Sequence, residues 1–215
     1  LKHLFFVLLL LLGQFSHSAW AYDFLTPTPY EAQPDSPSEL ALESYIAFPI
    51  QNGITLYWDG KQFELRDGKT ITPPAWFAKV LGTTPMVGIM LGKDDDEINT
   101  IQRILHQPNA TQAWRRLRFI ATDLPNSSEP FETRLQQITD MAAQARSPNF
   151  SIINNRQIFG SEKDLQKALD QQYAIGKDGF ILKNINAPYT NDDNAILLAL
   201  AYSRGEAVVL THRTG

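Results

Sequence analysis

The sequence contains no cysteine among its 215 residues, which excludes disulfides, thiolate zinc sites and cysteine nucleophiles together. Histidine is scarce as well: beyond residue 21 only His106 and His212 remain, far apart and without metal-site spacing around them. The chain also lacks the GxSxG, P-loop and HExxH patterns. Ser-His-Asp chemistry stays open on spacing alone, although nothing argues for it. None of the common motif classes therefore explains the protein.

Long apolar runs are missing from the chain except at its start. Residues 4–12 are apolar, follow Lys2, and precede a small-residue stretch at 19–21 (Ala-Trp-Ala). This order is typical of a secretory signal peptide. A membrane-spanning helix needs roughly 20 continuous apolar residues, and Gln14 interrupts the run too early. We therefore expect a signal peptide over residues 1–21, cleavage after Ala21, a periplasmic or secreted protein, and no stable membrane anchor.

Positive charge is also in short supply. Residues 1–21 hold one Lys and no acid, so the remaining 18 Lys and Arg against 23 Asp and Glu give a net charge of −5. Nucleic acids are held mainly by Lys and Arg on phosphates, so this sign disfavours broad nucleic-acid binding. With 43% hydrophobic and 11% aromatic residues, the rest of the chain is expected to be globular.

The pattern along the chain predicts an α+β domain. Residues 22–39 are rich in Pro, Thr and Ser and predict an extended leader on the surface, followed by one domain over residues 40–215. Strand and turn signals at 54–66 predict consecutive hairpin elements, and further strands are expected at 87–91, 117–121, 180–182 and 207–210. Helical spacing is found over residues 94–106, after Ser127-Ser128 with Phe131, Leu135, Ile138 and Met141 on one face, and after Ser161 with its capping partner Asp164. Strands and helices mix without regular βαβ alternation.

Three charged clusters invite a functional interpretation. Asp178 in the Lys177-Asp178-Gly179 turn, with Lys183 beyond it, would suit a ribose or phosphate ligand, although a solvated turn explains the same residues. The run at 114–118 (WRRLR) suits phosphates and bases, or an exposed face. The acidic run at 94–97 lacks the spacing of a calcium loop and predicts a charged helix start.

Several stretches, taken in order, resemble the small exported ATP-dependent DNA ligases of Gram-negative bacteria. They cover nearly all of residues 40–212 and read YWDGK (57–61), LRDG (65–68), PAWF (74–77), AWRRLRF (113–119), DLP (123–125), PFETRL (130–135), DGFIL (178–182), APY (187–189) and EAVV (206–209). The resemblance implies a nucleotidyltransferase fold in which two mixed β-sheets, flanked by helices, border a nucleotide cleft. In such ligases a Lys in a Lys-x-Asp-Gly motif attacks the α-phosphate of ATP, assisted by Mg²⁺, and AMP then passes to the 5′-phosphate of a nick.

The nucleophile motif is degenerate in this sequence. It falls on residues 50–53, where Gly53 is kept, Asn52 replaces Asp, and Ile50 stands in place of the Lys. The Arg that follows the motif is replaced by Thr55. An alkyl side chain has no lone pair, so covalent catalysis at residue 50 is excluded in this alignment.

Most of the other motifs of the resemblance have also lost charged or aromatic side chains. Arg66 is kept, whereas the Asp-Gly-Glu-Leu motif reads VGIM over 87–90 and loses both carboxylates, and Thr122 replaces an aromatic residue that stacks on adenine. At the Glu-Gly motif, Asp178 is one methylene shorter. The Leu-Leu-Lys-x-Lys motif falls on residues 197–201 and places Ala199 and Ala201 where two ammonium groups neutralise the triphosphate.

The resemblance therefore predicts a degenerate ligase-like protein without catalysis. We expect no catalytic residue and no metal site, and a vestigial nucleotide cleft formed by Ile50, Gly53, Arg66, Asp178, Gly179 and Lys183. No bound cofactor is expected, and ATP and Mg²⁺ enter only if the protein is an enzyme. Nucleotide or nicked DNA are partners by resemblance alone, and a protein partner is open. The oligonucleotide-binding (OB) domain that follows in the family is expected to be absent.

Three alternatives stay open. An active ligase or other nucleotidyltransferase would need a displaced lysine, with Lys61 as one candidate. An exported ligand- or partner-binding module would need no catalysis. A decaying remnant would have no selected function, although an intact signal peptide and amphipathic pattern argue against it.

Overall fold

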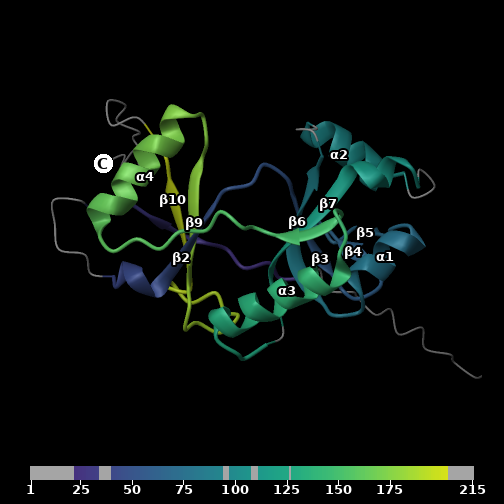
Figure 1. Ribbon diagram of the computed structural model, residues 1–215, viewed down its shortest axis with the longest axis horizontal. Helices are drawn as coiled ribbons and strands as arrows, with labels where there is room; N and C mark the ends of the chain where they lie inside the picture. Colours follow the sequence, from purple (N-terminus) through teal and green to yellow (C-terminus); the bar gives the residue numbers. More distant parts are fainter. Residues whose placement is uncertain (1–21, 34–39, 94–96, 108–110, 126, 203–215) are drawn as a thin grey trace, which may run out of the picture.

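A computed structural model describes residues 22–33, 40–93, 97–107, 111–125 and 127–202. The chain folds into two mixed β-sheets, shown on the left and the right of Figure 1, with helices on their outer sides. This architecture is the α+β arrangement of two mixed sheets that the sequence predicts.

The first sheet has the strand order β1-β10-β9-β2. Strand β2 (Tyr45–Pro49) and strand β10 (Ile196–Leu200) both pair antiparallel with β9 (Gly179–Asn184), and β1 (Thr28–Tyr30) adds in parallel to β10. One face of this sheet is covered by helix α4 (Glu162–Ala174), whose Leu165 and Leu169 pack against Phe180 and Leu182. The helix begins as predicted, because Ser161 Oγ accepts a hydrogen bond from the Asp164 amide at 3.2 Å.

The second sheet has the order β5-β4-β3-β6-β7-β8. Its strands are β3 (Ile54–Trp58), β4 (Phe63–Glu64), β5 (Thr70–Ile71), β6 (Met86–Gly92), β7 (Leu117–Asp123) and β8 (Phe150–Ile152). All pairs are antiparallel except β7 with β8. The hairpin expected around residues 54–66 is confirmed, since β3 pairs with β4 across the Asp59-Gly60 turn.

Helices α1 (Ala75–Leu81), α2 (Ile98–Leu105) and α3 (Phe131–Ala145) accompany the second sheet, with the 3₁₀ turns η1 (Leu42–Ser44) and η2 (Ala113–Arg116) in the connections. The larger core joins this sheet, these helices and the inner face of β2, through Ile46 and Phe48. Helix α3 starts at Phe131, a little later than expected after Ser127-Ser128, because Pro130 is its N-cap residue.

The leader is the clearest departure from the sequence prediction. Residues 22–33 do not merely cross the surface ahead of a domain that starts near Leu40. Thr28–Tyr30 form the edge strand β1, and Phe24 is buried. Alternation in the sequence is too short here to predict a strand, because β1 depends on β10 as its template.

Strands β2 and β10 were not predicted either. Every residue of β2, which lies at one edge of the first sheet, is buried, and all five residues of β10 are apolar, so neither short run carries a period-2 signal in the sequence. The strand expected at 207–210, the acidic residues 94–96 and the signal peptide over 1–21 lie outside the described residues. Among the helices that the structure describes, none is long and apolar enough to span a bilayer.

Candidate functional site

A cavity of about 260 Å³ lies between the two sheets. Its walls come from the inner faces of both sheets and from the segment that precedes β1. The lining residues are Phe24, Leu25, Pro27, Phe48, Pro49, Ile50, Gln51, Thr55, Arg66, Val87, Ile89, Ala121, Thr122, Asp123, Leu135, Ile152, Ile153, Ile181, Lys183, Tyr189 and Ile196. Most of these side chains are apolar, and the charged groups are confined to Arg66, Asp123 and Lys183.

Ile50 directly follows strand β2 and lines the cavity. Its backbone amide donates to the Gly179 carbonyl at 3.0 Å, which ties the end of β2 to the start of β9. The nearby Gly53 does not line the cavity. A Cβ there would lie 2.4 Å from Leu91 Cδ2 and 2.6 Å from the Met90 carbonyl oxygen, so packing against β6 requires glycine at residue 53.

Strands β6 and β7 supply the opposite wall. Val87 and Ile89 alternate with core residues along β6, so both side chains face the cavity. Thr122 lies beside them on β7 and donates from its hydroxyl to the Val87 carbonyl at 3.2 Å. The positions that the resemblance assigns to two carboxylates and an adenine-stacking ring therefore present two alkyl groups and one small hydroxyl.

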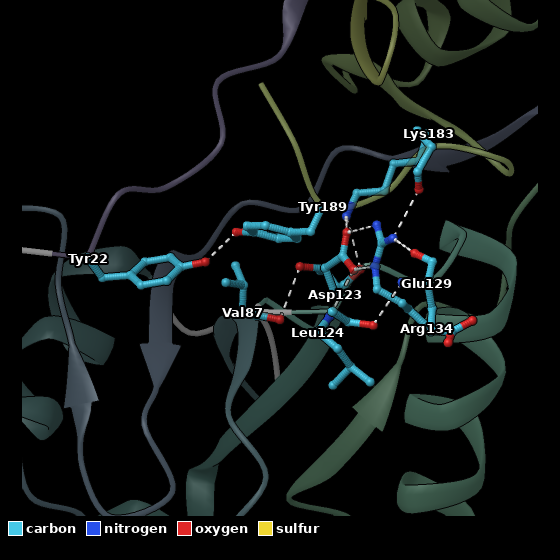
Figure 2. Close-up of polar contacts among 11 residues, drawn as sticks. Tyr22, Val87, Asp123, Leu124, Glu129, Arg134, Lys183 and Tyr189 are labelled. Carbon is cyan, nitrogen blue, oxygen red and sulfur yellow. Dashed lines mark hydrogen bonds and ion pairs between the residues drawn. The ribbon is translucent and has the colours of Figure 1, made fainter. Parts of the chain in front are cut away.

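A buried ion cluster at one side of the cavity joins the two sheets (Figure 2). Asp123 ends β7 and is 1% exposed. Arg134 on α3 donates to its carboxylate from Nε at 2.6 Å and from a terminal nitrogen at 3.3 Å, and Lys183 on β9 donates from Nζ at 2.8 Å. Lys183 also donates to the Thr122 carbonyl at 3.0 Å, and Arg134 to the Ala187 carbonyl at 3.0 Å and to the Glu129 carbonyl.

The carboxylate of this cluster stays ionised despite its burial. Desolvation alone would raise the pKa of Asp123, but the Lys183 charge and the hydrogen bond and charge of Arg134 outweigh it and hold the pKa below its ordinary value. One carboxylate thus faces two cations, which leaves a net positive charge at this wall of the cavity.

Arg66 provides a second positive group. It follows β4, its side chain is exposed, and its guanidinium carbon lies 4.9 Å from the centroid of the Phe24 ring, a cation–π contact. Within the described part of the chain no carboxylate forms an ion pair with Arg66. Its guanidinium, which carries five N–H donors, can therefore meet a ligand at the edge of the cavity.

Two tyrosines meet beside the cavity: Tyr189 lines it, and Tyr22 contacts Tyr189 from the start of the described chain. Tyr22 donates from its hydroxyl to Tyr189 Oη at 2.5 Å, and its ring stacks on Tyr57 with centroids 3.9 Å apart (Figure 2 shows the tyrosine pair). Burial, followed by this hydrogen bond, raises the pKa of Tyr22 well above its usual range. Burial raises the pKa of Tyr189 to about 12, although the hydrogen bond from Tyr22 acts in the opposite direction. Both phenols are therefore neutral donors or acceptors at ordinary pH.

The residues predicted for the vestigial cleft separate into three groups. Ile50, Arg66 and Lys183 line the cavity. Gly53 and Gly179 support the backbone: Gly179 has φ +121°, and a Cβ there would lie 2.2 Å from the Ala199 carbonyl oxygen. Asp178 is exposed and does not line the cavity, so the turn that explains it as a solvated Asp-Gly fits better than a ligand role.

Strand β10 contains Ala199, one of the two positions at which the resemblance expects an ammonium group. Ala199 lies in the smaller core beneath α4, on the sheet face that points away from the cavity. Because side chains alternate along a strand, the cavity face of β10 carries Ile196, Leu198 and Leu200 instead. An ammonium group at residue 199 would therefore not reach the cavity, and neither face of β10 offers a lysine.

The sequence missed most of the remaining lining. Phe24 and Leu25 lie in the supposed leader, and Asp123 and Arg134 were noted only as framework residues. The WRRLR run divides between core and solvent, since Trp114 and Leu117 are buried while Arg115 and Arg116 are exposed. The ion cluster could not be predicted, because Asp, Arg and Lys are rarely buried and the sequence does not show which of them are.

The side chains that line the cavity do not suit a divalent cation bound to a nucleoside triphosphate. Hard cations prefer carboxylate oxygens, and the one carboxylate in the lining, Asp123, is saturated by Arg134 and Lys183. In the portion of the chain that is described, no group of three or more His, Cys, Asp or Glu side chains is arranged to hold a metal ion. No step through ATP or Mg²⁺ follows from this geometry.

The chain is similar in sequence to a DNA ligase of Haemophilus influenzae, with 26% identity over 178 residues. The match covers 81% of this chain and 64% of that ligase, so the chain spans less than two thirds of its relative. No protein-family model matches the chain.

Three solved structures show the same fold. A Lig E DNA ligase superposes with a TM-score of 0.65 at 19% identity, covering 84% of this chain and 70% of that one. The Chlorella virus DNA ligase-adenylate gives 0.55 at 12% identity, covering 81% and 67%. The ATP-dependent DNA ligase from bacteriophage T7, in complex with ATP, gives 0.55 at 12% identity, covering 81% and 66%. By sequence and fold together, the chain is a homologue of DNA ligases and carries the nucleotidyltransferase fold of the ATP-dependent ligase adenylation domain.

Proposed function

We propose that this ligase-like adenylation domain does not form a covalent adenylate and acts without catalysis. The observation that carries the proposal is Ile50, which directly follows β2 and lines the cavity at the position that the resemblance assigns to the nucleophilic lysine. A phosphoramidate needs a nitrogen lone pair, which an isoleucine side chain lacks.

The rest of the cavity supports the same proposal. Phosphoryl and nucleotidyl transfer depend on positioned cations that offset the charge on the transferred phosphate. The aligned carboxylate positions hold Val87 and Ile89, and the cavity face of β10 holds Ile196 and Leu198. At these aligned positions the cavity therefore presents alkyl groups in place of the carboxylates and ammonium groups that the reaction needs.

A displaced lysine is the second candidate, and one observation favours it. Among the described residues that line the cavity, Lys183 is the only lysine. Its ammonium donates to Asp123 and to the Thr122 carbonyl, and an ion-paired ammonium has no lone pair to attack a phosphate. Lys61, the candidate that the sequence offers, is exposed in the turn between β3 and β4 and does not line the cavity.

We further propose that the protein is exported and serves as a ligand- or partner-binding module. Support comes from the signal-peptide pattern of residues 1–21 and from the cavity between the sheets, which is present although the aligned reactive groups are absent. Nucleotide and nicked DNA are partners by resemblance to the ligases alone. The net charge of −5 without residues 1–21 weighs against DNA as a partner of this protein.

Incubation with ATP labelled at the α-phosphate, in the presence of Mg²⁺, tests the proposal. We expect no label on the protein after denaturation and no sealing of a nicked duplex, whereas the Haemophilus influenzae DNA ligase, assayed in parallel, serves as the positive control. Covalent label on the wild-type protein would refute the proposal. Loss of that label in Lys183→Gln but not in Lys61→Gln would then identify the displaced lysine.

A further inference from the structure

We propose that the cavity between the sheets binds a small amphiphile: an apolar body, alkyl or aryl, that carries a single carboxylate. This inference rests on the proposed absence of adenylation, because it assigns a different ligand to the same cleft. It concerns the chemistry of the ligand, which the loss of catalysis alone does not determine.

The apolar walls set the body of the ligand. Ile50, Val87, Ile89, Ile181 and Ile196 contribute branched alkyl groups from both sheets. Ligand pockets are typically lined by such side chains with a few convergent polar groups. The polar edge of a nucleobase would be left without partners against these alkyl groups, and buried unpaired donors and acceptors strongly disfavour binding. An alkyl chain or an aromatic ring meets no such cost.

The charges set the head group of the ligand. Arg66 has no carboxylate partner in the described residues and presents its guanidinium at the edge of the cavity, over the Phe24 ring. A guanidinium and a carboxylate match in a two-point hydrogen-bond geometry. Lys183 and Arg134 outnumber the carboxylate of Asp123 on the other wall, so the local field also favours an anion. A triphosphate would need further cations, which the lining lacks.

A homologous series of probes tests the apolar part. Hexanoate, octanoate and decanoate are titrated calorimetrically into the protein, with octanol and AMP as comparisons. Each methylene that enters the cavity should tighten binding about fourfold until the cavity is filled. Octanoate should bind at least tenfold more tightly than octanol and more tightly than AMP, because only octanoate combines the alkyl body with the charge.

Arg66→Gln tests the head group. The variant should lose the preference of octanoate over octanol while octanol binding stays unchanged. Lys61→Gln is the matched control, since it removes one exposed positive charge from the same sheet without touching the lining. Arg66 is exposed, and a thermal melt verifies that both variants stay folded.

Three results would overturn this ligand class: no binding of any carboxylate in the series, affinity that does not rise with chain length, or an unchanged carboxylate preference in Arg66→Gln. Label transfer from ATP is read separately. A protein that takes up AMP covalently yet binds octanoate through Arg66 would refute the proposed lack of catalysis and leave the ligand class standing.

A separate contact leads us to infer a role for the predicted cleavage after Ala21. The backbone nitrogen of Tyr22 donates to the Glu64 carboxylate on β4, while the Tyr22 ring stacks on Tyr57 and its hydroxyl reaches Tyr189. Cleavage would turn this amide into an α-amino group, whose ordinary pKa of about 7.7–8.0 keeps it charged at neutral pH. The Glu64 carboxylate then bonds to a charged ammonium group instead of a neutral amide, so the hydrogen bond becomes an ion pair. Processing would thereby fasten the segment of Phe24 and its neighbours that walls the cavity.

A two-by-two comparison tests this role. Protein that starts at Tyr22 and protein that retains Ala21 are each made with Glu64 and with Glu64→Gln. The substitution should lower the melting temperature of the form starting at Tyr22 by roughly 2–4 °C, and that of the form with Ala21 by much less. Glu43→Gln, an exposed carboxylate on η1, is the control and should shift neither form. Equal shifts in both forms, or an exported protein whose N-terminus is not Tyr22, would overturn the inference.

Discussion

Replacement of Asp123 by Asn is the sharpest test of how the two sheets are held together. The substitution keeps the shape of the side chain but removes the charge that both Arg134 and Lys183 contact. Two buried cations then face a neutral amide whose NH₂ group is itself a donor. Breaking a buried ion pair by removing one partner costs about 3–5 kcal/mol, and here one carboxylate serves two partners. We therefore expect Asp123→Asn to lower the free energy of unfolding by about 3–5 kcal/mol.

Urea unfolding followed by tryptophan fluorescence measures this loss, with the slope against denaturant compared between variants so that a change in midpoint reports stability. Asp67→Asn is the control, because Asp67 also pairs with a lysine, at 2.7 Å, but both side chains are more than half exposed. Its free energy of unfolding should stay close to the wild-type value. A loss in Asp123→Asn no larger than that in Asp67→Asn would refute the assignment of the cluster as a buried clasp.

The pH dependence follows from the same carboxylate. Its folded pKa lies below the ordinary value of 3.8, so its contribution is fully present above that value and is lost as pH falls through the folded pKa. The difference in unfolding free energy between wild type and Asp123→Asn should therefore be constant at neutral pH and shrink on acidification below about pH 4.

Three further perturbations are predicted from individual contacts. Gly179→Ala should destabilise the protein by more than 1 kcal/mol, because its Cβ would lie 2.2 Å from the Ala199 carbonyl oxygen, whereas Gly82→Ala, with positive φ but open space, should cost less in the same urea titration. Ser161→Ala should cost about 1 kcal/mol, measured by thermal unfolding, because it removes the side-chain cap of α4; an unchanged melting temperature would contradict the cap. Ultraviolet titration should show one phenol that ionises near pH 12 and is absent from Tyr189→Phe; a variant with the wild-type titration curve would contradict this assignment.

Local chemistry made part of the fold predictable. The Asp59-Gly60 turn between two alternating runs predicts the β3–β4 hairpin, and Ser161 with Asp164 predicts the start of α4, because both signals act within a few residues. Strand β1 was not predictable in the same way. Its three residues pair with β10, 169 positions later for each partner, as in Thr28 with Leu197. The information that makes them a strand lies in the partner.

Only some of the residues that line the cavity could be predicted from the motifs of the sequence. Ile50 directly follows β2 and Arg66 lies two residues beyond β4, and both line the cavity. Ala199 shows the limit, since a shift of one residue in a strand turns the side chain to the other face. Asp178 shows a second limit, because its side chain is exposed although the neighbouring Gly179 is required by close packing.

The ion cluster also limits how the cavity can exchange its contents. Asp123 belongs to one sheet and Lys183 to the other, so hinging the sheets apart would break the ion pair between them and the hydrogen bond from Lys183 to the Thr122 carbonyl. By contrast, the wall made by Phe24 and Leu25 belongs to a single extended segment with a three-residue strand. Opening the cavity at that segment would leave the bonds of Asp123 intact, so a small molecule could enter beneath the start of the described chain without breaking the ion cluster.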